Sequence, residues 1–160
     1  MALRKPLVMN SGQVEQIQSR DTLDAVVAEV DVVTLTNNNA SPIVIGAPVY
    51  CESAGKVDLA QADASATVQT FGLVRDTSIA ASASGEIQTD GILSASTSQW
   101  DAAAGTTGGL TAGTVYFLSA ATVGELTETA PTTGGEYVVR VGVALSTTEM
   151  EISFTQPILL

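Results

Sequence analysis

The sequence predicts an all-β protein, and three observations support this prediction. Thr, Ser, Ala and Gly are abundant while Lys and Arg total six, and such a composition favours strands and turns over helices. Near the end of the chain, Met150, Ile152 and Phe154 alternate with polar residues, as the residues of a half-buried strand do. A unit of strand, glycine turn and strand also occurs twice.

The repeated unit predicts a body built from two loosely duplicated β-modules. Gly46–Tyr50 corresponds to Gly113–Tyr116, Gly55–Leu59 to Gly124–Leu126, and Phe71–Val74 to Val141–Ala144. The intervals between these segments differ by a few residues, so the repeat is not a tandem array. We expect a compact body like a β-barrel or β-sandwich over residues 23–160, with modules at about 43–93 and 110–158.

The core of this body is expected to be thin. Apolar residues make up 45% of the 160 residues but aromatic residues only 4%, and large side chains supply most of the buried area. Small β-modules with thin cores often stabilise one another by association. The composition therefore favours a homo-oligomer.

Residues 1–22 are predicted to form an extended N-terminal arm. Pro6 disfavours a helix at Lys5, and the Asn-Ser-Gly sequence of residues 10–12 is typical of a turn. Residues 1–20 carry three cations and one anion, a net charge of +2, so the remaining residues carry −13 in a chain of net charge −11. A basic leader on an acidic body indicates a segment that docks where the body does not, and a solvated tail is the alternative.

Several local features follow from the pattern of residues. Residues 21–36 favour a strand or a bent pair of strands over a helix, and the three asparagines at 37–39 favour a turn. Pro48 indicates an edge strand or a bulge, and Cys51 is interpreted as a small buried hydrophobe. Residues 86–93 alternate around an Asp-Gly pair, which predicts a tight hairpin.

The segment 94–112 is predicted to be a long connection with one helical turn near Gln99–Ala103. Trp100 is interpreted as the anchor of this connection to a core or an interface, with ligand stacking as the alternative. Gln156–Leu160 is apolar for the end of a chain. Leaving its three aliphatic side chains in water is unfavourable by roughly 1.5–3 kcal/mol each, so we expect them to pack on the body or on a neighbouring subunit.

The residue types present argue against several functional classes. Histidine is absent and Cys51 is the only cysteine, which argues against a histidine-based triad, an intramolecular disulfide and a cysteine cluster for metal. The net charge of −11 argues against nucleic-acid binding, and no apolar run approaches the ~18 residues of a membrane span. We therefore expect neither a cofactor nor a metal, and no enzyme activity.

Three acidic pairs are the remaining candidates for chemistry. They are Glu149 with Glu151, Glu125 with Glu128, and Asp58 with Asp63. Two carboxylates on one strand face can meet the spacing of a glycosidase, and Asp58 or Asp63 with other oxygen ligands could hold a structural calcium ion. The favoured interpretation is a solvated acidic face.

The second module resembles small β-rich virion proteins of phages, of the capsid decoration or cement type. The residues that carry this resemblance are Gly113–Tyr116, Gly124–Thr127, Glu136–Gly142 and Glu151–Phe154. Lys5–Val8, Gly12–Gln16 and Asp21–Leu23 resemble the N-terminal segments of phage fibre and head-fibre proteins. The resemblance implies a virion protein, made in the host cytoplasm, that binds the major capsid protein at the capsid surface, often as a homotrimer.

These expectations converge on a predicted interface with the capsid or with other subunits. It comprises Leu3, Arg4, Lys5, Pro6, Leu7, Val8, Val14, Ile17, Trp100, Ile158, Leu159 and Leu160. The alternative function is a segment of a head or tail fibre that binds a host receptor or a glycan. A glycan-binding module would need exposed aromatic side chains, for which Trp100 and Tyr137 are the candidates.

Overall fold

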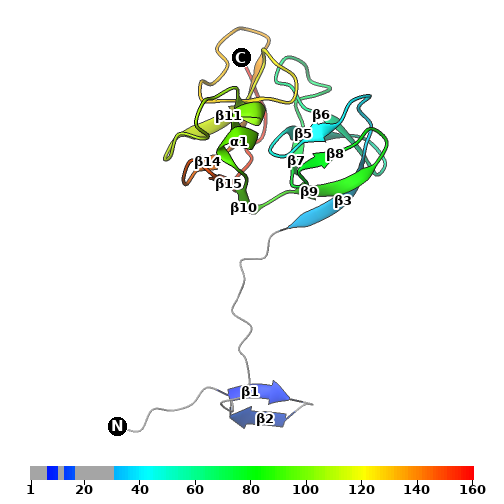
Figure 1. Ribbon diagram of the computed structural model, residues 1–160, viewed down its shortest axis with the longest axis vertical. Coiled ribbons are helices and arrows are strands. Elements are labelled where there is room, and N and C mark those ends of the chain that lie inside the picture. Colours follow the sequence, from blue (N-terminus) through cyan, green and yellow to red (C-terminus); the bar gives the residue numbers. More distant parts are fainter. Residues whose placement is uncertain (1–6, 11–12, 17–30) are drawn as a thin grey trace.

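The computed structural model describes residues 7–10, 13–16 and 31–160. These residues form sixteen short strands and one short helix, which confirms the prediction of an all-β fold (Figure 1). The N-terminal residues form a hairpin of β1 (Leu7–Asn10) and β2 (Gln13–Gln16), in which Leu7 is opposite Gln16. The predicted arm therefore contains a hairpin, whereas its residues 1–6, 11–12 and 17–22 lie outside the described residues.

The first half of the body is a closed five-stranded barrel, which confirms the predicted barrel-like character. Its strands are β3 (Val32–Asn37), β5 (Pro48–Ser53), β6 (Lys56–Leu59), β7 (Thr70–Val74) and β9 (Ser84–Gln88). The order around the barrel is β3-β6-β5-β7-β9, and a parallel pairing between β3 and β6 closes it. A separate small sheet is formed by β4 (Ile43–Val44) and β8 (Ser78–Ile79), and its two isoleucines belong to the core of the barrel.

The second half is an open five-stranded sheet with the order β10-β15-β14-β11-β12. Its strands are β10 (Gly91–Ser94), β11 (Val115–Leu118), β12 (Leu126–Thr127), β14 (Arg140–Ala144) and β15 (Glu149–Ile152). Helix α1 (Thr97–Ala104) follows β10, and a further pair is formed by β13 (Tyr137–Val138) and β16 (Ile158–Leu159).

The two halves share one strand plan, which gives the predicted duplication a structural basis. Starting from β3, the barrel reads β3-β9-β7-β5-β6, and the open sheet reads β10-β15-β14-β11-β12. Val49 is opposite Gly72 in the barrel, and Tyr116 is opposite Gly142 in the sheet. A shift of register follows immediately in both places.

The register corrects the alignment of the two modules by one residue. Because Val49 and Tyr116 both face the middle glycine of a third strand, they are equivalent, and Tyr50 corresponds to Phe117 and not to Tyr116. Gly46 and Gly113 then align without a gap, and both have positive φ angles, of 81° and 80°. Glycine is favoured here because left-handed backbone is strained for other residues.

The boundary between the modules also differs from the prediction. Strand β10 was expected in the first module, within a tight hairpin with β9, but it pairs with β15 of the second sheet. Both edges of β9 are already occupied, by β3 and by β7. The hairpin prediction is therefore wrong. Gly91, with a φ of 81°, instead turns the chain out of the barrel and into the second sheet.

Two further local predictions depend on strand position. Pro48 is not on an edge strand, because β5 has neighbours on both sides, whereas the bulge that was its alternative has a counterpart in the shift of register between Val49 and Tyr50. As the first residue of the strand, Pro48 tolerates its missing amide. Cys51, predicted to be buried, is exposed because β7 accompanies β5 only as far as Tyr50, so the end of β5 projects past its neighbour. The turn predicted from the asparagines is present: the side-chain oxygen of Asn37 accepts from the backbone N–H of Asn39 (2.7 Å), and that of Asn39 accepts from the backbone N–H of Ser41 (2.9 Å).

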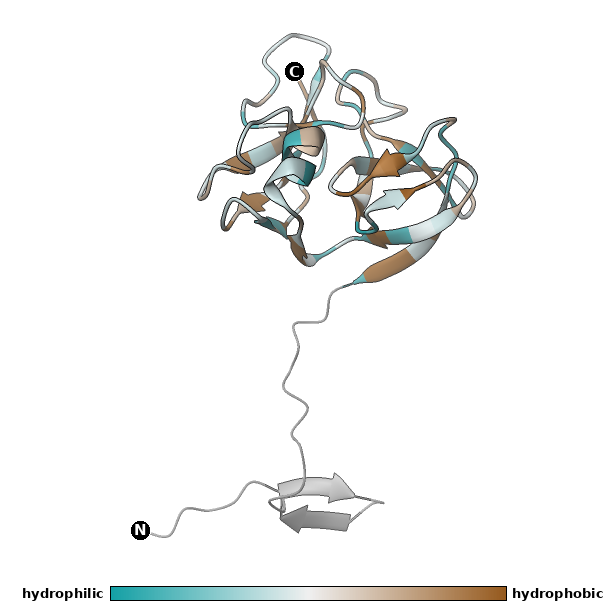
Figure 2. Cartoon of the chain, viewed as in Figure 1, coloured by the Kyte–Doolittle hydropathy of each residue, from teal (hydrophilic) through white to brown (hydrophobic). Residues whose placement is uncertain are grey.

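The larger of two hydrophobic cores joins the two halves. It contains Leu73 and Val68 from the barrel side together with Tyr116, Leu118 and other residues of the open sheet. The smaller core lies inside the barrel and includes Val49, among others. Figure 2 shows hydrophobic residues in strands of both halves. The two modules are therefore held together by apolar side chains from both halves that are buried in one core.

Helix α1 is longer than the single predicted turn, and a reciprocal pair of hydrogen bonds between Ser96 and Gln99 caps its N-terminus. The Ser96 hydroxyl accepts from the backbone N–H of Gln99, and the Gln99 side chain accepts from the backbone N–H of Ser96. This reciprocal arrangement satisfies two N–H groups that the first turn leaves free. The helix ends at Gly105, which is left-handed.

Replacing the central glycine of β14 tests the duplicated strand geometry. A Cβ atom on Gly142 would collide with the backbone carbonyl oxygen of Glu151, and one on Gly72 would lie 2.7 Å from that of Gln88. We expect Gly142→Ala to lower the free energy of unfolding by ~1–3 kcal/mol, the usual cost of overpacking. Gly134→Ala is the matched control, because a Cβ atom added there would meet no other atom within 4 Å. Equal urea midpoints for the two variants would contradict this explanation.

Candidate functional site

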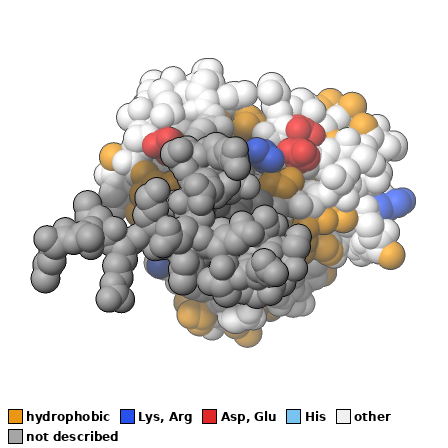
Figure 3. All heavy atoms as spheres, turned by 90° about the horizontal axis from the view of Figure 1, so that it is seen from below, with side chains coloured by type: hydrophobic (Ala, Val, Ile, Leu, Met, Phe, Trp, Pro, Cys, Tyr) orange, Lys and Arg blue, Asp and Glu red, His pale blue; other side chains and the backbone are white. Residues whose placement is uncertain are grey.

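The C-terminal strand β16 presents the most exposed aliphatic side chains among the described residues. Ile158 is 61% exposed, Leu159 60% and Leu160 45%. Successive side chains of a strand point to opposite faces, so neither face of β16 is covered. The other exposed large aliphatic residues belong to different strands and loops, and such single residues are ordinary: they are Val33, Val44, Ile92, Val123 and Leu145. Figure 3 shows hydrophobic side chains in several separate places on one face.

The backbone of this C-terminal segment is nevertheless attached to the body. Tyr137 is opposite Leu159, the N–H of Leu160 donates to the carbonyl of Glu136 (3.0 Å), and the N–H of Gly135 donates to the carbonyl of Leu160 (3.1 Å). No other described strand pairs with β16, so its outer edge is open. The expectation that the aliphatic side chains pack on the chain's own body is therefore wrong, while packing on a neighbouring subunit stays a prediction.

A cavity of about 240 Å³ adjoins this segment through Glu136. Its lining is rich in hydroxyl groups and small side chains: Ser119, Ala120, Ala121, Thr127, Thr129, Ala130, Pro131, Thr132, Thr133 and Glu136. The Glu136 carboxylate accepts one hydrogen bond from a described residue, the backbone N–H of Thr133 at 3.4 Å. Sequence reasoning missed this site, although the run of threonines and glycines before Glu136 could have indicated it.

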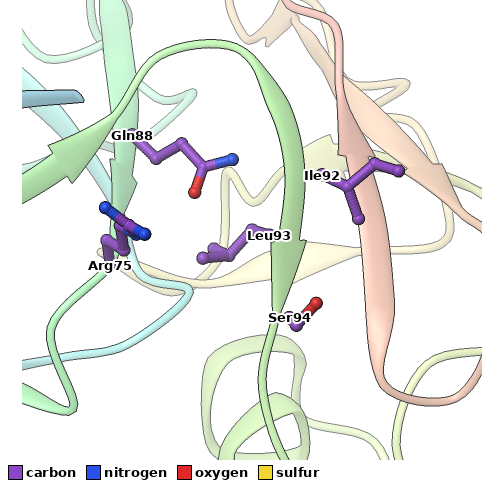
Figure 4. Close-up of a pocket in the computed structure, with 5 residues that line it drawn as sticks. All are labelled: Arg75, Gln88, Ile92, Leu93 and Ser94. Atoms are coloured by element: carbon purple, nitrogen blue, oxygen red, sulfur yellow. The ribbon is translucent and has the colours of Figure 1, made fainter. Parts of the chain in front are cut away.

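A second cavity, of about 220 Å³, lies where the barrel meets the open sheet (Figure 4). Arg75, Gln88, Ile92, Leu93 and Ser94 line it. Figure 4 shows Gln88 and Leu93 on one side of β10, with Ile92 on the other. The guanidinium is already paired with Glu86 at 3.0 Å, and both side chains of the pair are about half exposed. An exposed pair of this kind contributes little to stability.

Apart from Trp100, the predicted interface residues fall into three groups. Leu3, Arg4, Lys5, Pro6 and Ile17 lie outside the described residues. Leu7 and Val8 belong to β1 and Val14 belongs to β2, where Val8 is opposite Glu15 and Val14 is opposite Met9. Ile158 and Leu159 of β16 and the adjoining Leu160 are all exposed.

Trp100 does not belong to an exposed interface. It is 0% exposed, and its indole nitrogen donates to the carbonyl of Thr148 at 3.0 Å. A Cβ atom on Gly46 would lie 2.9 Å from the indole ring, so the barrel approaches the ring closely. The structure thus places Trp100 in the shared core, as the anchor of the long connection. A buried indole also cannot stack on a sugar, which removes one of the two aromatic candidates for glycan binding.

Tyr116 and Glu128 form a short hydrogen bond that braces two loops. The buried tyrosine hydroxyl donates to the Glu128 carboxylate at 2.6 Å and accepts from the backbone N–H of Thr111 at 2.9 Å. Burial, and then the hydrogen bond to Glu128, raise the pKa of Tyr116. Hydrogen bonds from the Thr111 side chain and from Tyr116 lower the pKa of Glu128. Because the ring is buried, we interpret the pair as a structural brace.

Of the three acidic pairs considered for chemistry, one has Glu128 in the brace with Tyr116. Another has Asp58, whose carboxylate accepts hydrogen bonds from the Asn39 side chain and the Leu59 N–H. Glu149 and Glu151 are exposed on β15, in the alternation expected for a solvated face. Within residues 31–160, no three acidic or cysteine side chains gather as a metal site would require. Over the same range, no helix has the length and apolar character needed to span a membrane.

Comparisons with known proteins give no independent assignment. No protein-family model matches the chain, and no curated protein matches it either.

Asp101 fixes the loop that follows helix α1. Its carboxylate accepts hydrogen bonds from the backbone N–H groups of Gly109 (2.7 Å) and Gly108 (3.1 Å) and from the Thr106 hydroxyl (3.1 Å). The bond from Gly109 is the main cause that holds the pKa of Asp101 below its ordinary value, against partial desolvation.

This geometry predicts a pH-dependent effect of Asp101→Asn. A carboxyl group whose pKa is lower in the folded chain stabilises the fold above its ordinary pKa of about 3.8, and this contribution is lost as the pH falls through the folded-state value. We therefore expect the variant to melt below the wild type at pH 7, with the gap narrowing below about pH 3.8. Thermal melts followed by circular dichroism measure the gap, and a gap that stays constant well below the ordinary pKa would contradict the role of the carboxylate.

Proposed function

We propose that the protein is a structural virion protein that binds the outside of a phage capsid and stabilises the lattice of the major capsid protein. The observation that carries the proposal is the exposed aliphatic strand β16, which is held by its backbone and covered on neither face. Burying an aliphatic side chain of this kind is worth roughly 1.5–3 kcal/mol. Such a strand is suited to stable contact with another protein surface.

The repetition of a lattice strengthens this argument. Contacts that are weak singly become strong when linked copies engage many sites at once. A homo-oligomer, such as the trimer that the sequence resemblance implies, would bring several copies of β16 and of the N-terminal arm to the capsid together. The acidic body would then face solvent, where its net charge favours solubility.

A structural role also agrees with the chemistry of the described residues. The guanidinium at the cavity between the two halves is already paired, and the buried Tyr116 is engaged in a brace. The acidic side chains of β15 point to solvent. We therefore propose a role in assembly, with the virion surface as its location and the major capsid protein as its partner.

Removal of residues 1–20 tests the role of the arm. This segment carries a net charge of +2 in a chain of net charge −11, and β1 and β2 form only a two-stranded hairpin, which is marginally stable without a partner surface. We expect the truncated chain to lose co-sedimentation with capsids that lack the protein, while its far-ultraviolet strand signal is retained. Undiminished binding of the truncated chain would reject the arm as a capsid contact.

The matched control for this experiment leaves the arm intact. Lys56→Ala removes a cation from the exposed end of the barrel, so it changes the net charge without touching residues 1–20. We expect this variant to co-sediment like the wild type. Loss of binding in both variants would indicate a general charge effect in place of a contact made by the arm.

A further inference from the structure

We infer that strand β16 and the adjoining cavity at Glu136 form an acceptor site for the basic N-terminal segment, residues 3–7, of a second copy of the chain. The inference concerns contact between copies, so it is independent of whether the protein binds a capsid.

The acceptor combines an apolar strand with a carboxylate. Ile158 and Leu159 are 61% and 60% exposed, and the outer edge of β16 has no partner among the described strands. An open edge of this kind can accept an extended segment through backbone hydrogen bonds. Because the N–H of Leu160 bonds to the carbonyl of Glu136, the carboxylate-bearing residue lies beside the end of the strand.

The cavity gives this carboxylate room for a cationic partner. It measures about 240 Å³, and apart from Glu136 its lining carries hydroxyl groups or small apolar side chains without charge. The Glu136 carboxylate accepts only a long hydrogen bond, 3.4 Å from the Thr133 nitrogen, from the residues that the structure describes. A guanidinium or ammonium group entering the cavity would form a stronger, charge-assisted hydrogen bond with it.

The N-terminal segment has the complementary chemistry. Residues 3–7 read Leu-Arg-Lys-Pro-Leu, with two cations between aliphatic residues. Residues 31–160 carry thirteen acidic and three basic side chains, a net charge of −10, so the leader is the chain's main concentration of positive charge. Two such bodies repel each other, and a basic segment placed between them reduces that repulsion.

The first strand of the body and its C-terminal end lie at opposite sides, which favours a second copy as the source of the segment. In Figure 1 the chain enters β3 at the lower side of the body, whereas the C-terminal end lies at the upper side. A contact between the N-terminal segment of one copy and β16 of another is head-to-tail, and contacts of this kind build either a closed ring or an open chain.

Two complementary variants test this contact in the purified full-length protein without capsids. Arg4→Ala/Lys5→Ala removes the donor charges, and Glu136→Ala/Leu159→Asp impairs the acceptor. We expect sedimentation velocity to show the wild type as an oligomer and each variant as a monomer. The loss of one to two charge-assisted hydrogen bonds should raise the dissociation constant about tenfold or more. Because a head-to-tail contact needs one intact donor and one intact acceptor, an equimolar mixture of the two variants should form dimers.

The matched control carries the same kinds of change on another face. Ile92 and Glu151 are exposed and directly opposite each other on β10 and β15, so Ile92→Asp/Glu151→Ala should sediment like the wild type. Glu136→Gln keeps the shape of the side chain and removes its charge, so it should also weaken association. It replaces the acceptor double variant if that variant folds poorly. A monomeric wild type, an unaltered Glu136→Gln variant, or a mixture that stays monomeric would each overturn the inference. A monomeric wild type whose β16 resists proteolysis, together with an Arg4→Ala/Lys5→Ala variant whose β16 is cleaved, would place the contact within one chain. That result would also overturn the inference.

Discussion

The shared hydrophobic core is the constraint on which the rest of the structure depends. The chain has few large side chains, so neither module can bury much apolar area by itself. The larger core solves this by combining residues of the barrel with residues of the open sheet. Trp100 completes it from helix α1, since its ring lies against Gly46 and its indole nitrogen is bonded to Thr148. The two modules consequently form one body.

The duplicated strand plan closes in one half and stays open in the other, and the connection after the first strand accounts for the difference. In the barrel, β3 reaches β6, and Thr36 and Asn37 pair with Lys56 and Val57. In the second half, helix α1 follows β10 immediately and contacts β12. With a helix where the barrel has a strand contact, the edges of β10 and β12 remain apart. The same plan therefore yields a barrel and a helix-covered sheet.

Charge and exposed apolar surface are unevenly distributed along the chain, and the proposals on function rest on this uneven distribution. The acidic side chains lie mainly on the body, while half of the cations are in residues 1–20. The exposed aliphatic side chains that adjoin one another are at the C-terminus, where the backbone of Leu160 is hydrogen-bonded to the backbone of Glu136. An exposed apolar strand paired with a segment that carries a cavity-lining carboxylate is suited to bind a basic partner segment. Assembly, with other copies or with a larger shell, is the role that uses these features together.

The sequence by itself determined the all-β class, the duplication, the burial of Met150 and Ile152, and the apolar end of the chain, because these follow from composition and from the two-residue period of strands. Only the tertiary structure decided the strand partners. The Asp-Gly turn before β10 looks like a hairpin locally, yet β9 has no free edge, so β10 pairs with β15. Pairing over long separations likewise left Cys51 beyond the end of β7, buried Trp100 and brought Glu136 beside Leu160. A local sequence pattern indicates which residues favour burial. Pairing between strands that are distant in the sequence decides which of those residues are buried.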